Sequence, residues 1–178
     1  MSKLEEAVPV KLFTGIIYSK NARVDKCIKR LEKRLGNADY VSEKFPFHYT
    51  TYYENEMGTE LSRIIITFKP LIKRDELVKI KHFTNDLEQS FSSNERRQIN
   101  IDPGYIAPEH LILATGKGYY HRPYLGKGVY ADLTLVYMKK DFRPLRWTYP
   151  DYRTKKLRRL FKNLRERYMV ELTEVKFA

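Results

Sequence analysis

The densest group of chemically useful side chains lies in the segment Thr115–Gly128, TGKGYYHRPYLGKG. Its glycines permit positive φ angles and leave backbone N–H groups uncovered. Successive exposed N–H groups beside a lysine make an anion-binding nest. The segment therefore predicts a phosphate site, with cations and a stacking ring from Lys117, Arg122, Lys127 and Tyr120. The alternative is a pair of ordinary hairpin turns whose lysines lie in solvent.

A second polar cluster is Phe45–Glu56, FPFHYTTYYENE. In a strand, His48, Thr50 and Tyr52 would share one face. His48-Tyr49-Thr50 also matches the His-x-Thr pattern of the two-histidine phosphoesterases, whose paired histidines act as base and acid across a cleft. A second match, His82-Phe83-Thr84, falls inside a predicted helix, which disfavours that pairing. We instead predict His48 and His121 as catalytic residues, with Tyr53 as a second stacking ring.

Two shorter motifs contain aspartates. Asp102 precedes Pro103-Gly104, which predicts a tight turn in which its carboxylate caps backbone donors. The alternative is that Asp102 binds a ligand, either a metal or a sugar hydroxyl. In WTYPDYR, Asp151 is expected to cap the final helix. The rings of Trp147 and Tyr149 either close the core or form a ligand wall.

Several familiar chemistries are poorly supported by the residue spacing. The four histidines include no i,i+4 pair and no HExxH motif, so we predict no metal, although a mixed site of His48 and His121 with Asp102 or Glu54 stays open. The segment with Lys117 is not a Walker A loop, because a leucine and a glycine stand where the motif needs glycine and Ser/Thr. The single Cys27 excludes an intrachain disulfide. The cofactor is left unknown.

The elements that must position these residues follow from hydrophobic periodicity. We expect a single α+β domain over residues 1–178, with a mixed or antiparallel sheet and three main helices. Its first two thirds fit a split βαβ, ferredoxin-like core, followed by a β-meander. Strands are expected over 10–19, 40–54, 60–69, 98–101 and 129–138, and helices over 23–35, 75–91 and about 154–170. Residues 108–115 fit either a short strand or a helical turn.

The net charge of +12 is concentrated at one end of the chain. Residues 139–178 carry eight of the twelve excess positive charges, whereas residues 100–138 are neutral. A basic final helix would present Arg158, Arg159, Lys162, Arg165 and Arg167 to a phosphate backbone. The alternatives are a solvated helix face or pairing with an acidic partner. Because no apolar run approaches the roughly 20 residues of a membrane span and no signal peptide is evident, we expect a cytoplasmic protein without a membrane partner.

Nearly the whole chain resembles the DUF4416 family of bacterial and archaeal proteins. The resemblance rests on NIDPGYIAPEHLILATGKGYYHRPYLGKGVYADLTLVY followed by FRPLRWTYPDYR, and on GIIYS, FPFHYTTYYENEMG and FKPLI. It implies no established activity. A GTP-binding label is sometimes attached to members, but this chain has no P-loop and no NKxD-like motif to support it.

Besides a structural or oligomerisation role in which the basic helix pairs with an acidic partner, two functions remain open at this point. The first is a phosphate-ligand protein that binds a nucleotide or RNA, with hydrolase or phosphoesterase-type catalysis as an option. In it, the FHYTTYYE and GKGYYHRPYLGKG segments meet in one cleft and bring His48 and His121 within about 10 Å, the span of one small ligand. The second is a non-enzymatic RNA- or ribosome-associated protein that uses the basic helix. The oligomeric state is unknown.

Overall fold

The chain folds around one nine-stranded antiparallel sheet, and the α+β prediction is confirmed. The structure, a computed structural model, describes residues 1, 3–92 and 96–177. Its strands are β1 Val10–Ser19, β2 Ala38–Val41, β3 Phe45–Phe47, β4 Leu61–Ile72, β5 Ile99–Ile106, β6 His110–Thr115, β7 Tyr124–Gly126, β8 Val129–Met138 and β9 Asp141–Pro144. Its helices are α1 Val24–Leu35, α2 Glu54–Met57, α3 Leu77–Ser90 and α4 Lys155–Phe177, with a 3₁₀ turn at Arg74–Glu76. None of the helices in this described part of the chain is long and apolar enough to cross a bilayer.

The strands follow the order β2-β4-β1-β5-β6-β8-β7, while β3 also pairs with β4 and β9 with β8. Helix α1 connects β1 to β2, which have β4 between them, and α3 connects β4 to β5, which have β1 between them. Each of these two connections therefore skips one strand. The remaining strands extend the sheet on the β5 side.

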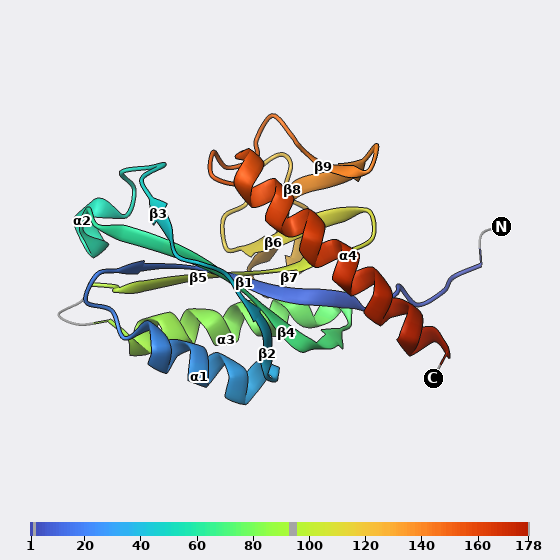
Figure 1. The fold of residues 1–178 in the computed structure, drawn as a ribbon, viewed down its shortest axis with the longest axis horizontal. Helices are drawn as coiled ribbons and strands as arrows, with labels where there is room; N and C mark the ends of the chain where they lie inside the picture. The colour runs from blue at the N-terminus through green and yellow to red at the C-terminus, as the bar shows by residue number, and fades with distance from the viewer. Residues whose placement is uncertain (2, 93–95, 178) are drawn as a thin grey trace.

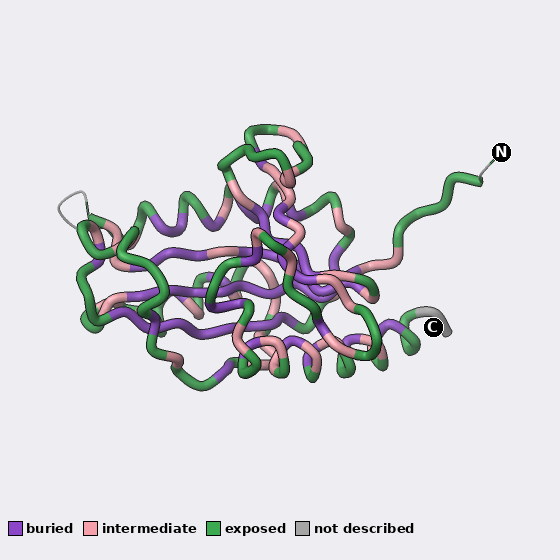
Figure 2. Tube along the Cα trace, turned by 90° about the horizontal axis from the view of Figure 1, so that it is seen from above, coloured by how far each residue is buried: buried purple, intermediate pink, exposed green. Residues whose placement is uncertain are grey.

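Helices cover both faces of the sheet, with α1 and α3 on one face and α4 on the other (Figure 1). The alternation of strand side chains supplies both cores. In β1, Leu12 and Ile16 face α1 and α3, whereas Phe13 packs edge-on against Phe161 of α4 with ring centroids 4.9 Å apart. The central strands are buried along most of their length (Figure 2). Cys27 lies in the first core, where burial raises the pKa of its thiol to about 12.

Helix α4 leaves one end of its sheet face uncovered. Arg63 shares a face of β4 with Ile65, which packs in the α4 core, and Asp102 shares a face of β5 with Ile106 in the same way. Both polar residues point to the side of α4 but lie beyond its start. The prediction that Asp151 caps α4 is wrong, because the hydroxyl of Thr154 accepts the N–H of Leu157 at 3.3 Å.

Strand β5 runs through Pro103 and Gly104, where the sequence predicted a break and a turn. Within β5, only residues 104–106 pair with β6, so the earlier residues of β5 have no strand partner on that side within the described residues, although they pair with β1 on the other side. Proline is tolerated on such an edge. Gly104 is needed for close approach, because a Cβ there would overlap the carbonyl oxygen of Ile112 and lie 2.8 Å from the Phe13 ring. Asp102 is therefore a strand residue and not a turn residue.

This close approach gives a stability prediction. We expect Gly104→Ala to lower the free energy of unfolding by about 1–3 kcal/mol, since an added methyl group in a packed core forces its neighbours to move. Gly116→Ala is the matched control, because a Cβ at Gly116 would meet its nearest atom only at 4.0 Å. Urea unfolding of both variants measures the difference. Equal losses would show that the β5–β6 contact does not require glycine.

Candidate functional site

A cavity of about 430 Å³ occupies the uncovered end of the α4 face. Strands β4, β5, β6 and β8 contribute its floor and back wall. The segment between β3 and α2 and the segment before α4 contribute the other walls. The polar lining residues are Tyr49, Thr50, Tyr52, Tyr53, Arg63, Asp102, Thr115, Lys117, Asp132, Tyr149, Asp151 and Tyr152. Such a volume and mixture of rings with a few polar groups is typical of small-molecule sites.

Arg63 is the buried cation of the cavity floor. Its Nη1 donates to the carboxylate of Asp151 in a short ion pair, and its Nη2 lies 3.7 Å from Oδ2 of Asp102. The guanidinium also lies over two rings, 4.9 Å from the centroid of Phe47 and 5.2 Å from that of Tyr152. Burial raises the pKa of Asp151, and the positive charge of Arg63 opposes that rise.

Two buried donors on this floor have no hydrogen-bond partner among the described residues: Nε of Arg63 and the hydroxyl of Tyr152. The Tyr152 hydroxyl lies over Gly15 of β1, where an added Cβ would come within 3.1 Å of it. Burial raises the pKa of Tyr152, so its hydroxyl stays protonated and can donate. A buried unpaired donor costs about 1–3 kcal/mol.

Asp132 forms the polar side wall, and two residues outside the cavity hold its carboxylate in place. Its Oδ2 accepts from Nε of Arg122 at 2.7 Å and lies 3.4 Å from Nε2 of His121. Arg122 also donates to the hydroxyl of Tyr149 at 2.8 Å and to the carbonyl of Lys117 at 3.1 Å. Arg122 therefore connects the loop after β6 to Asp132 and Tyr149, which belong to two walls of the cavity.

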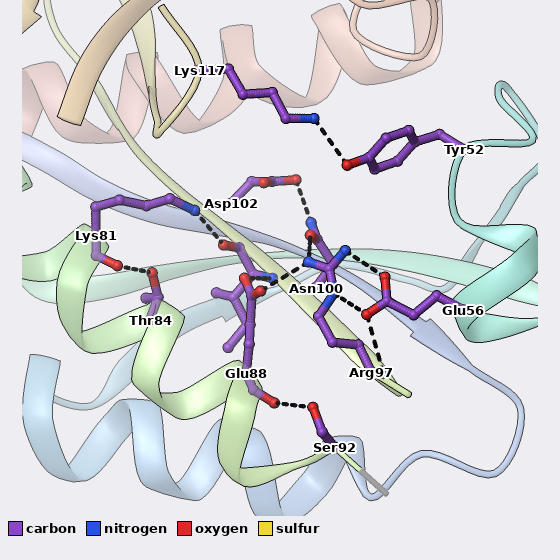
Figure 3. A network of polar contacts seen from close by, with 11 residues as sticks. Tyr52, Glu56, Lys81, Thr84, Glu88, Ser92, Arg97, Asn100, Asp102 and Lys117 are labelled. Carbon is purple, nitrogen blue, oxygen red and sulfur yellow. Dashed lines mark hydrogen bonds and ion pairs between the residues drawn. The ribbon is translucent and has the colours of Figure 1, made fainter. Parts of the chain in front are cut away.

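The rim is formed where Lys117 and Tyr52 meet. Nζ of Lys117 donates to the Tyr52 hydroxyl at 3.0 Å, and Figure 3 shows the two side chains reaching toward each other from separate segments. Tyr53 lies deeper, and burial, followed by the nearby charge of Asp102, raises the pKa of its hydroxyl. The rim thus combines one exposed cation with tyrosine rings.

Arg97 connects the floor of the cavity to α2 and α3 (Figure 3). It donates to Glu56 of α2 through Nε at 2.8 Å, to Glu88 of α3 at 3.2 Å and to Oδ1 of Asn100 at 3.1 Å. Asn100 in turn donates to Asp102 at 2.9 Å. The hydrogen bond from Arg97 lowers the pKa of Glu56, so this carboxylate is charged at neutral pH. The wall that carries Tyr52 and Tyr53 is therefore tied to β5.

The structure brings together only some of the residues that the sequence predicted for the site. Tyr53, Asp102 and Lys117 line the cavity, and Arg122 supports it from outside. Of the two rings left open in the sequence, Tyr149 forms a wall. Trp147 instead donates to the carbonyl of Leu133 at 2.8 Å.

The other predicted site residues lie elsewhere. His48 is exposed in a separate shallow groove, because it follows the inward-facing Phe47 and points the other way. His121 is stacked on Trp147 at 4.7 Å behind Asp132, so the two histidines do not share one cleft. Tyr120 is exposed outside the cavity. Lys127 lies at the β7–β8 turn with a positive φ, and its carbonyl contacts Nε2 of His82 on α3.

The basic face of α4 is partly engaged with the fold. Arg158 donates to Asp141 at 3.3 Å, Arg165 lies 3.5 Å from the ring centroid of Tyr137, and Arg167 lies 5.8 Å from that of Tyr40. Arg159 is exposed and Lys162 is half-buried. RNA binding by this helix stays a prediction, with fewer free cations than the sequence suggested.

Comparison with known proteins identifies the family. The model of a domain of unknown function, DUF4416, matches residues 8–168 of the 178-residue chain. The chain belongs to the DUF4416 family. No curated protein and no solved structure matches it. The DUF4416 match includes every residue that lines the cavity.

Arg63, Asp132 and Tyr152 were missed by sequence reasoning, although a signal existed. Arg63 and Asp132 interrupt apolar strands, and a charge in such a strand must be paired or bind something. Within the described residues, no three His, Cys, Asp or Glu side chains are grouped to hold a metal ion. The cavity thus places hydrogen-bond donors, carboxylate acceptors and aromatic rings around a space of the size of one small ligand.

The burial of Arg63 gives a stability prediction. We expect Arg63→Met to lower the free energy of unfolding by about 3–5 kcal/mol, since it leaves buried carboxylates unpaired. Lys117→Met, at the exposed rim, should change it by less than about 0.5 kcal/mol. Urea unfolding at pH 7 compares them. A small loss in Arg63→Met would show that the ion pairs contribute little.

The same variant should acquire a pH dependence. Without Arg63, burial leaves the pKa of Asp151 higher still, so the folded state holds a proton that the unfolded chain releases above about pH 4. Stability then falls as pH rises toward the folded pKa. The deficit of Arg63→Met relative to wild type should be larger at pH 8 than at pH 5, as urea unfolding would show. The double variant Arg63→Met/Asp151→Asn should lose most of this dependence, and a pH-independent deficit in the single variant would contradict the assignment.

Proposed function

We propose that the cavity binds a nucleotide, with its ring system inside and its phosphate at the rim. The observation that supports this best is the pair of buried unpartnered donors, Arg63 Nε and Tyr152 hydroxyl, beneath a rim that carries Lys117. A ligand that satisfies both ends must have polar ring or sugar atoms at one end and an anion at the other. Nucleotides have this chemistry.

Charge decides which end of the ligand enters. The floor and side wall hold three carboxylates, Asp102, Asp132 and Asp151, against the cations Arg63 and Arg122. A doubly charged phosphate would be repelled there. Lys117 has no acidic partner within the described part of the chain and is exposed. The phosphate is therefore stabilised at the rim, beside Lys117.

The floor can recognise a neutral polar group by both donation and acceptance. Arg63 and Tyr152 donate, while the carboxylate of Asp102 is half-buried and accepts. Base edges and sugar hydroxyls offer complementary acceptors and donors. The tyrosine rings provide flat apolar walls with polar tips, which suits packing against a base. Proton transfer by His48 or His121 is not part of this proposal, because both lie outside the lining.

Titration calorimetry with the four ribonucleoside 5′-monophosphates and their nucleosides tests the proposal. Wild type should bind a nucleotide more tightly than its nucleoside, and Lys117→Met should remove that difference. Tyr152→Phe should weaken both ligands by about 2- to 12-fold, the effect of one hydrogen bond. Lys127→Met is the matched control and should change nothing.

Two results would overturn this proposal. One is that no nucleotide binds at millimolar concentration. The other is that Lys117→Met and Lys127→Met weaken binding equally, which would indicate non-specific attraction to a basic protein.

A further inference from the structure

The loop after β6 presents two tyrosines to solvent beside the cavity rim. Tyr119 is 62% exposed and Tyr120 is 78% exposed, and their ring centroids lie 4.8 Å apart. Tyr52, on the other side of Lys117, is also exposed. We call these three rings the tyrosine platform. A group of large exposed aromatic side chains often marks an interaction site, whereas a single exposed ring needs no such explanation.

The platform is fixed from beneath. His121 stacks on Trp147 with ring centroids 4.7 Å apart, and Trp147 is itself held by its hydrogen bond to Leu133. Arg122 holds the backbone of the same loop through the carbonyl of Lys117. The rings of Tyr119 and Tyr120 therefore stand on a supported loop, and a ligand need not order that loop on binding.

Lys117 links the platform to the cavity. Lys117 lines the cavity, donates to Tyr52 and lies two residues before Tyr119. Its Nζ also lies 4.3 Å from the ring centroid of Tyr52.

The charge of the segment indicates the chemistry of the occupant. Residues 110–131 contain Lys117, Arg122 and Lys127 and no acidic residue. Arg146, beside Trp147, is exposed as well. Rings that stack on bases together with cations that track a backbone are the features by which proteins bind single-stranded nucleic acid. A neutral protein partner would need no cations on this surface.

We propose that the natural ligand is the end of a single-stranded nucleic acid, whose terminal nucleotide occupies the cavity while the following bases stack on Tyr119 and Tyr120. This rests on the proposed nucleotide site, because the phosphate at Lys117 is the point where a strand would leave the cavity. A duplex is disfavoured, since its terminal base would have to unpair to enter the cavity and its other bases are not free to stack on tyrosine.

Binding of a mononucleotide and of trinucleotide and hexanucleotide RNA and DNA, measured by calorimetry, tests the inference. The trinucleotide should bind at least fivefold more tightly than the mononucleotide, and the hexanucleotide little more than that. Tyr119→Ala/Tyr120→Ala should remove this gain and leave mononucleotide affinity unchanged. Met138→Ala, also exposed and apolar, is the matched control. The affinity should fall with salt by a slope of about −0.7 for each phosphate contact.

The outcomes separate the two proposals. If the mononucleotide binds but the trinucleotide gains nothing, the strand inference is wrong and the nucleotide site stands. A gain that survives Tyr119→Ala/Tyr120→Ala, or equal binding of a duplex, also overturns the inference. If neither ligand binds, both proposals fail. Comparison of the RNA and DNA arms shows which strand the site accepts.

Discussion

The burial of Arg63 is the constraint on which the rest of the site depends. Its guanidinium lies on a central strand, on the face that α4 covers farther along. A cation in that position must be paired, and Asp151 supplies the partner from the segment just before α4. The segment just before α4 is therefore held to the sheet by an ion pair across 88 residues of sequence. Packing of α4 alone would not fix that segment.

The same constraint explains why the cavity stays open. Apolar side chains cannot cover a guanidinium without leaving its N–H groups unsatisfied, so the core of α4 ends at this point. Phe47 and Tyr152 cover the guanidinium with their ring faces, and its Nε remains unpaired among the described residues. The Arg63–Asp151 ion pair is already formed, whereas other donors beside it have no partner among the described residues. This combination suits a polar ligand. The proposed nucleotide site thus relies on the same residue as the ion pair beneath α4.

The sequence predicted the long elements well, because β1, β4, β8 and the three main helices each show clear periodicity. It failed at β5, since Pro103-Gly104 is a turn signal whose meaning here depends on how far β6 extends. The ferredoxin-like name stays a prediction: the order β2-β4-β1-β5 agrees with it, but no solved structure matches the chain.

The site was predictable at the level of segments and not of side chains. The two polar segments do meet, at Lys117 and Tyr52. Strand alternation and loop geometry decide which side chains point into the cavity. His48 does not line the cavity, because it follows the inward-facing Phe47. Arg63 is not predicted as a site residue, because the apolar pattern of its strand by itself indicates only a core position. A charge inside such a strand is a stronger site signal than an exposed histidine, since burial forces it to find partners.

Net charge does not by itself locate an anion site. Most of the positive excess lies in the last forty residues, yet Arg158 is paired with Asp141 and Arg165 packs on Tyr137 and donates to the carbonyl of Pro108. Lys117 lies in a charge-neutral segment and has only a tyrosine hydroxyl as partner within the described residues. What attracts an anion is a cation without an acidic neighbour at an accessible place. Among the described residues, Lys117 at the rim of the cavity meets that criterion, as do the exposed Arg159 and Arg167 on α4.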